Sequence, residues 1–181
     1  MRPHITILKG DITIIPVDAI VNPANNTLLG GGGIDGAIHR KAGPKLLEEC
    51  KKIRKEKLPD GLSTGDAILT GAYDLPAKHV IHVAGPIHSR DPIYLLKRCY
   101  REALRIAEEN KVKSISIPAV STGAYHVPVK RSAIDVKQAI DTMQFNHITE
   151  IKLVLYSEFD KRIYDQIFDG NSKPETSFDR H

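Results

Sequence analysis

The sequence contains few of the residues that mark several common classes of protein. Its 181 residues include two cysteines, no tryptophan and only 6% aromatic residues. Cys50 and Cys99 form no metal-binding spacing, and they predict buried, reduced thiols in a cytoplasmic protein. No apolar run approaches the roughly 18–20 residues that a membrane-spanning helix needs. Charges and a proline interrupt residues 1–16, so we expect neither a signal peptide nor a membrane span.

Residues of like charge are also rarely clustered along the sequence. The formal net charge is +4 at pH 7, and the single basic cluster is KKIRKEK at residues 51–57. A solvent-exposed helix end accounts for such a cluster. No aromatic-rich strand or nucleic-acid motif accompanies it. The composition is therefore compatible with an anionic ligand, and nucleic acid is not the expected partner.

Hydrophobic periodicity predicts strands that alternate with helices. The expected strands are 4–9, 18–22, 67–72, 79–85, 114–120 and 150–156, and the expected helices are 35–42, 44–56, 92–110, 129–145 and 158–168. Because a helical crossover returns the chain in the same direction, the sheet should be mixed but mostly parallel, within a three-layer α/β/α sandwich. The first strand is the candidate for an antiparallel edge position. One domain over residues 1–169 is expected, followed by a disordered tail, 170–181.

A run of four glycines, residues 30–33, lies between an asparagine-rich turn and the start of a helix. Consecutive glycines can adopt positive φ and direct their backbone N–H groups to one point. The helix N-terminus adds unpaired N–H groups and a partial positive charge, which favour phosphate. The alternative is a flexible surface loop. Ordering four glycines costs several kcal/mol of chain entropy, however, and binding of a ligand would offset that cost. The run therefore predicts a phosphate-binding loop.

A dinucleotide-binding interpretation of the glycine run is weaker. Gly31, Gly33 and Gly36 match the dinucleotide pattern G-x-G-x-x-G, yet PANNTLLG separates them from the strand and the expected ribose-binding acid is missing.

A second loop, PAVSTGAYHVP at 118–128, offers small residues at the same sheet edge, which suggests a diphosphate held between two loops. It does not match the G-x-S-x-G motif of serine hydrolases, although a Ser121–His126 catalytic pair remains an alternative.

Four segments, in order, closely resemble the macro domain family. They are GDIT (10–13), VDAIVNPANNTLLGGGGIDGAIHRKAGP (17–44), LPAKHVIHVAGP (75–86) and IPAVSTGAYHVP (117–128). The long segment is similar to the MacroD-type branch, and the resemblance extends over residues 5–168. It implies the macro domain fold, binding of ADP-ribose, and hydrolysis of its esters. The esters would be mono-ADP-ribosyl groups on acidic protein side chains, and O-acetyl-ADP-ribose, with no cofactor or metal.

The resemblance also implies roles for individual residues. Asp11 would accept a hydrogen bond from the adenine amino group beside the backbone N–H of Ile12, and Tyr156 would pack against adenine. Asn25 and Asp35 would meet the distal ribose as catalytic residues. The diphosphate would be held by residues of both loops: Gly31, Gly32, Gly33, Ile34, Ser121, Thr122, Gly123, Ala124, Tyr125 and His126.

The residue types agree with these roles without deciding them. Aspartate accepts from an exocyclic amine, and asparagine both donates to and accepts from ribose hydroxyls, but both residues also build turns. Asp35 could orient or deprotonate a water, or only place a charge at a helix start. His39, one helical turn later, would tune Asp35 or simply pack. His79 and His82 are predicted to be core or surface residues rather than metal ligands.

The second loop reads STGAYHVP, whereas the family pattern is STG-I/V-Y-G-Y-P. Ala124 is smaller than the usual aliphatic residue, and His126 replaces a glycine. A positive φ at His126 would cost about 1–2 kcal/mol, whereas its imidazole could donate to phosphate or ribose. The altered loop keeps open the alternative of a non-catalytic ADP-ribose reader. An ADP-ribose 1″-phosphate phosphatase is a further alternative, because it would share the same pocket. Nothing in the sequence requires more than a monomer.

Overall fold

The computed structural model describes residues 1–170, and most of the predicted tail, 171–181, lies outside them. Twelve elements follow one another along these residues: β1 (His4–Lys9), η1 (Ile12–Ile14), β2 (Ala19–Ala24), α1 (Gly33–Ala42), α2 (Pro44–Glu56), β3 (Ala67–Gly71), β4 (His79–Ala84), α3 (Tyr94–Glu109), β5 (Ser114–Pro118), α4 (Val129–Thr142), β6 (Glu150–Leu155) and α5 (Glu158–Phe168). Every predicted strand and helix is present, with ends that differ by a few residues. Within this part of the chain, no helix is long and apolar enough to cross a membrane.

The six strands form one sheet in the order β1-β6-β5-β2-β4-β3. The expectation of an antiparallel first strand is wrong, because β1 lies at one edge but runs parallel to β6. The antiparallel strand is β3, at the other edge, where it pairs with β4. Only residues 72–78 join β3 to β4, and so short a connection without a helix reverses the chain. The direction of β1 is instead set by β6, its distant partner in the sequence.

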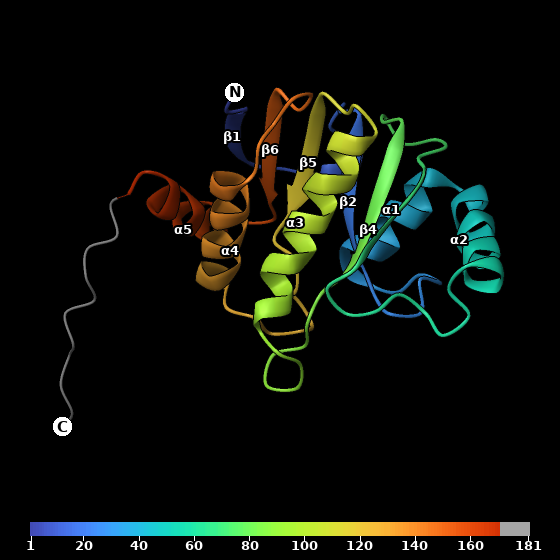
Figure 1. The fold of residues 1–181 in the computed structure, drawn as a ribbon. Helices are drawn as coiled ribbons and strands as arrows, with labels where there is room; N and C mark the ends of the chain where they lie inside the picture. The colour runs from blue at the N-terminus through green and yellow to red at the C-terminus, as the bar shows by residue number, and fades with distance from the viewer. Residues whose placement is uncertain (171–181) are drawn as a thin grey trace.

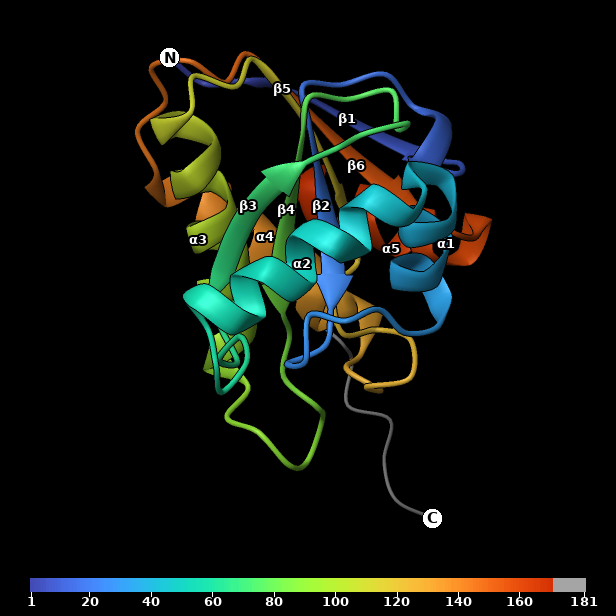
Figure 2. The ribbon, with the colours of Figure 1, turned by 90° about the vertical axis from the view of Figure 1, so that its right-hand side faces the viewer.

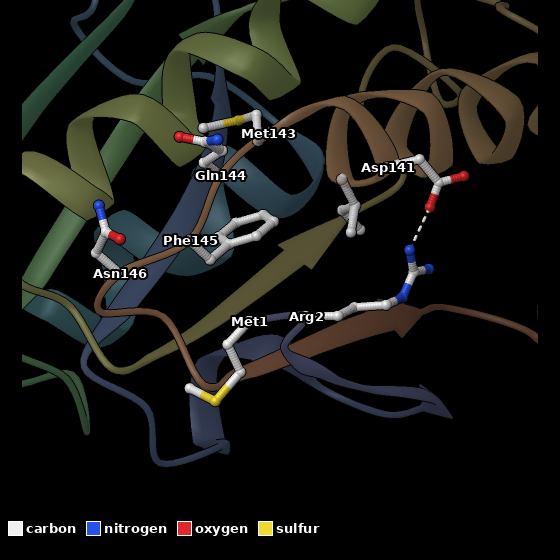
Figure 3. Close-up of a pocket in the computed structure, with 8 residues that line it drawn as sticks. Met1, Arg2, Asp141, Met143, Gln144, Phe145 and Asn146 are labelled. Atoms are coloured by element: carbon white, nitrogen blue, oxygen red, sulfur yellow. Dashed lines mark hydrogen bonds and ion pairs between the residues drawn. The ribbon is translucent and has the colours of Figure 1, made fainter.

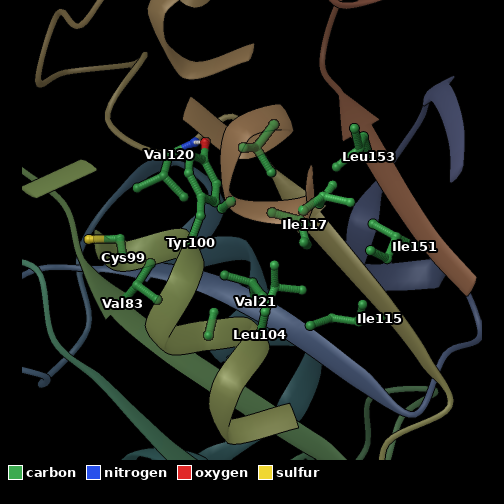
Figure 4. Packing of buried hydrophobic residues seen from close by; sticks show 14 of the residues in the cluster. Val21, Val83, Cys99, Tyr100, Leu104, Ile115, Ile117, Val120, Ile151 and Leu153 are labelled. Carbon is green, nitrogen blue, oxygen red and sulfur yellow. Dashed lines mark hydrogen bonds between the residues drawn. The ribbon is translucent and has the colours of Figure 1, made fainter. Parts of the chain in front are cut away.

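Helices cover both faces of the sheet, as the predicted three-layer sandwich requires. Helices α3, α4 and α5 lie on one face and α1 and α2 on the other (Figures 1 and 2). The core beneath α3 to α5 includes Val21, Val83, Tyr100, Leu104, Ile115, Ile117, Ile151 and Leu153 (Figure 4). Each buried aliphatic or aromatic side chain of this kind stabilises the fold by roughly 1.5–3 kcal/mol.

Cys50 on α2 and Cys99 on α3 are free and buried, as predicted. Burial raises the pKa of each thiol to about 12. Both cysteines therefore behave as small apolar core residues with an unreactive thiol.

The parallel strands bring several connecting loops to one edge of the sheet. Strands β5, β2 and β4 are neighbours that run in the same direction. The segments that follow them therefore leave the sheet side by side, at its carboxyl edge. These segments include the glycine run before α1 and the loop between β5 and α4. The topology thus joins the two predicted phosphate loops, which are almost 90 residues apart in the sequence.

Candidate active site

The opposite edge of the sheet holds a cavity that is unrelated to the predicted site. Its volume is about 410 Å³, and its lining includes Met1, Arg2, Asp141 and Phe145 (Figure 3). These residues precede β1 or lie at and after the end of α4, at the amino ends of the strands. Arg2 and Asp141 form an ion pair there. The candidate site lies instead at the carboxyl edge, where the loops meet.

The glycine run forms the start of α1, two residues earlier than predicted. Gly32 is the N-cap residue and Gly33 opens the helix. Gly33 has φ +56°, in the left-handed region that favours glycine. Gly31, Gly32 and Gly33 are exposed, so the backbone at the start of the helix is open to solvent. Such a terminus attracts an anion through its N–H groups and its partial positive charge.

Asn25 organises the turn that precedes the glycines. Its Oδ1 accepts from the backbone N–H of Thr27 at 3.0 Å and from Thr27 Oγ1 at 2.5 Å. Its Nδ2 donates to the carbonyl oxygen of Gly30 at 3.0 Å. Asn25 thus builds the turn, as asparagine often does. Its amide also lies next to the glycine run. If Gly31 carried a Cβ, that atom would be 3.2 Å from Asn25 Nδ2.

Asp35 comes to the same point from the first turn of α1. Its Oδ2 would also lie 3.2 Å from a Cβ on Gly31. The residue is buried, and its Oδ1 accepts from Asn22 Nδ2 at 2.8 Å. His39 Nε2 lies 3.4 Å from the same oxygen. Burial raises the pKa of the Asp35 carboxyl, while the Asn22 hydrogen bond and His39 act in the opposite direction.

Two polar residues behind Asp35 were not singled out for the site from the sequence. Asn22 on β2 and His82 on β4 are fully buried, and Asn22 Nδ2 lies 3.0 Å from His82 Nδ1. Burial, with a smaller contribution from His39, lowers the pKa of His82 to about 3, so its ring is neutral. Of the two positions predicted for His82, core or surface, the structure shows the core. The available signal was one polar residue inside each of two apolar strands.

Arg54, near the end of α2, holds the asparagine turn in place from outside the site. Its guanidinium donates to the carbonyl oxygens of Thr27 at 2.6 Å, Leu58 at 2.9 Å and Pro59 at 3.2 Å. The backbone N–H of Leu62 donates to Asn26 O at 2.8 Å. The segment after α2 therefore supports the turn that carries Asn25.

We expect the Arg54→Met variant to lower the free energy of unfolding by about 1–3 kcal/mol, because it removes hydrogen bonds made by a charged donor but keeps the apolar stem. Urea denaturation measures this difference. The matched control is Lys55→Met, which changes the exposed neighbour and should leave stability within about 0.5 kcal/mol. Equal effects of the two substitutions would contradict the role assigned to Arg54.

The second loop has a compact backbone with two strained residues. Ser121 has φ +66° and His126 has φ +61°. The backbone N–H of Val127 donates to Ser121 O at 2.9 Å, and that of His126 to Gly123 O at 3.0 Å. The left-handed conformation considered for His126 is thus present, with its cost for a non-glycine residue. Ala124 and His126 are exposed.

Ser121 is not arranged as a nucleophile. Within residues 1–170 its buried Oγ has no hydrogen-bond partner, so the alternative Ser121–His126 pair is not formed. The base of the loop is anchored from below, because the backbone N–H of Val120 donates to the Tyr100 hydroxyl at 3.0 Å. The loop therefore offers backbone groups and small side chains rather than a catalytic serine.

The remaining predicted residues follow the edge strand β1 and its neighbour β6. Asp11 Oδ1 accepts from Thr13 N at 2.9 Å and Thr13 Oγ1 at 2.7 Å, and these bonds lower the pKa of Asp11. Gly10 N donates to Leu155 O at 3.0 Å, which brings the segments containing Asp11 and Tyr156 together. Ile12 is buried, and Tyr156 is 87% exposed. An exposed ring and a carboxylate on adjacent segments are suited to a planar ligand with an amino group.

A model of the Macro domain family matches residues 21–135, more than half of the chain. The chain belongs to the macro domain family. This macro domain is 44% identical over 174 residues to an O-acetyl-ADP-ribose deacetylase of Escherichia fergusonii, covering 92% of this chain and 96% of the relative. It is 42% identical to the human ADP-ribose glycohydrolase MACROD2, covering 91% of this chain and 39% of that longer protein.

A solved structure supports the fold assignment independently. The Trypanosoma brucei macrodomain in complex with ADP-ribose is 35% identical to this macro domain and superposes with a TM-score of 0.83. The match covers 91% of this chain and 69% of that chain. The residues predicted for the site thus occupy one edge of this macro domain in three groups. Asn25, Asp35 and the glycines form the first, the second loop forms another, and Asp11, Ile12 and Tyr156 form the third.

Proposed function

We propose that this macro domain binds ADP-ribose across the carboxyl edge of its sheet and hydrolyses ADP-ribose esters. The observation that carries the proposal is the convergence of Asn25 Nδ2 and Asp35 Oδ2 beside Gly31, at the N-terminus of α1. A diphosphate would lie between that terminus and the second loop. Adenine would lie near Asp11, Ile12 and Tyr156, which leaves the distal ribose beside Asn25 and Asp35.

The proposed chemistry is addition of water to an ester, with Asp35 as the acid–base or orienting group. For O-acetyl-ADP-ribose, the water oxygen bonds to the acyl carbon and the ester C–O bond breaks. The ribose oxygen takes a proton, and acetate and ADP-ribose leave. For a protein ester, attack on the acyl carbon or on the ribose carbon gives the same products, ADP-ribose and a free carboxylate. The proposed route uses no metal or cofactor.

The geometry of Asp35 supports this role. One carboxylate oxygen is held by Asn22, and the other is directed toward Gly31. Because burial raises its pKa, the carboxylate is a stronger base than an exposed aspartate. The names of the deacetylase and glycohydrolase relatives agree with such a reaction. We further propose that residues 1–169 act as one domain and as a cytoplasmic monomer, with mono-ADP-ribosylated proteins as substrates.

The proposal predicts that the purified protein binds free ADP-ribose in calorimetry and releases ADP-ribose from a glutamate-linked ADP-ribosylated protein. It should also release acetate from O-acetyl-ADP-ribose. Binding should weaken little with added salt, unlike binding to a nucleic acid backbone. ADP-ribose binding without release from either ester would instead indicate a reader, with Ala124 and His126 as the first residues to restore to the family pattern. Turnover of ADP-ribose 1″-phosphate alone would indicate the phosphatase.

A further inference from the structure

Behind Asp35, three polar side chains form a continuous row across β2, β4 and the edge strand β3. Asn22 on β2, His82 on β4 and Thr70 on β3 are each at most 2% exposed. They lie among apolar residues of the core beneath α1 and α2, such as Ile20 and Val80. A buried polar group costs about 1–3 kcal/mol when it is left unpaired. Three polar side chains placed together in an apolar core indicate a role beyond packing.

The hydrogen bonds in this row allow one consistent assignment of donors and acceptors. The Thr70 hydroxyl donates to Gly71 O at 3.0 Å, so Thr70 Oγ1 accepts from His82 Nε2 at 2.9 Å. The proton of the neutral imidazole is then on Nε2, and Nδ1 is an acceptor. The Asn22 amide fills that acceptor with one N–H at 3.0 Å and gives its other N–H to Asp35 Oδ1 at 2.8 Å.

This arrangement decides which end of the Asn22 amide faces Asp35. A flipped amide would place its oxygen against two acceptors, His82 Nδ1 and Asp35 Oδ1, and would lose both hydrogen bonds. We propose that His82 is a positioning residue, which holds Asn22 as a donor to Asp35 and thereby keeps Asp35 Oδ2 turned toward the ligand. Thr70 supports the same role by fixing the His82 tautomer. The inference rests on the proposed hydrolytic function and extends it to residues that do not touch the substrate.

The surroundings of Asp35 make this donor important. From α1, His39 approaches the same oxygen at 3.4 Å. From α2, Cys50 interacts with Asp35, but its thiol is neutral because its pKa is about 12. From β4, His82 is neutral as well. Among the groups that the structure describes, the Asn22 N–H is therefore the principal neutral donor to Asp35, and it stabilises the ionised carboxylate.

We expect His82→Leu to slow ester hydrolysis about tenfold, with ADP-ribose affinity changed less than about threefold, because misplacing a catalytic group affects the chemical step most. Without a fixed donor, the pKa of Asp35 should rise by about one unit. The acidic limb of the kcat profile should move to higher pH by the same amount. Carbon-13 NMR titration of the Asp35 carboxyl measures this shift directly and requires no turnover.

Two further variants separate positioning from simple loss of packing. His82→Asn places an acceptor oxygen near the position of Nδ1 and should restore the Asp35 pKa and most of kcat. Thr70→Val keeps the shape of the side chain, removes the hydroxyl, and should shift the Asp35 pKa upward by less than His82→Leu. The matched control is His79→Leu on the same strand, where His79 is only half-buried. This control should leave the Asp35 pKa and kcat unchanged.

The outcomes separate this inference from the proposed function. An unchanged Asp35 pKa in folded His82→Leu would overturn the positioning role, even where wild type hydrolyses the ester. If His82→Leu does not fold, an unchanged Asp35 pKa in Thr70→Val overturns it in the same way. A wild type without hydrolysis would overturn the proposed function, and with it the effect on kcat, while the NMR titration still reports whether His82 controls Asp35.

Discussion

The Asp35→Asn variant is expected to hydrolyse O-acetyl-ADP-ribose about 10² to 10⁴-fold more slowly than wild type, the range for loss of a general acid–base group. The substitution preserves shape, and its side-chain carbonyl oxygen can still accept the hydrogen bond from Asn22 Nδ2. Only the charge and the basicity are removed. Binding of free ADP-ribose, measured by calorimetry, should therefore change much less than kcat.

The pH dependence supplies a second test of Asp35. Burial raises the pKa of its carboxyl above the ordinary value. If the ionised carboxylate does the chemistry, activity is present above that raised pKa and is lost as the pH falls through it. The residual activity of Asp35→Asn should lack this acidic limb. A variant with wild-type kcat, or one that keeps the same limb, would remove Asp35 from the mechanism.

The Gly36→Ala variant is expected to weaken ADP-ribose binding about 10- to 100-fold. A Cβ on Gly36 would lie 2.6 Å from the backbone oxygen of Gly31 and 3.1 Å from Arg40 Nη1. The backbone at Gly31 must then move, and the N–H groups next to it turn away from the diphosphate. Loss of one charge-assisted hydrogen bond, worth about 1.5–3 kcal/mol, accounts for this range.

Helix propensity makes the result easy to interpret. Alanine is favoured over glycine inside a helix by about 1 kcal/mol, so any loss of stability or affinity in Gly36→Ala comes from the close approach. The matched control is Gly71→Ala in β3, where an added Cβ makes contacts of 3.5 Å, ordinary van der Waals distances. Calorimetry should show wild-type affinity for the control. Equal affinities in both variants would contradict the diphosphate site at the glycine run.

Local patterns in the sequence were sufficient for the elements and for the position of the two loops between them. Alternation of polar and apolar residues in HITILK and helical spacing over 92–110 both depend on neighbours in the chain, which is why β1 and α3 were predicted. The glycine run and the aspartate that follows it are contiguous, so their place at the N-terminus of α1 was also predictable. The direction of β1 was not, because its partner, β6, lies about 145 residues away.

The sequence by itself thus determined the layers of the fold, the two loops and the residue types that meet there, since each depends on short segments. Only the tertiary structure decided that β3 is the antiparallel strand and that Asn22, His82 and Thr70 stand in a row behind Asp35. Those three residues come from three strands, and each looks like an isolated polar residue in an apolar segment. Their relation arises from the register of neighbouring strands and from burial, because hydrogen bonds between distant segments form only when the sheet brings their donors and acceptors together.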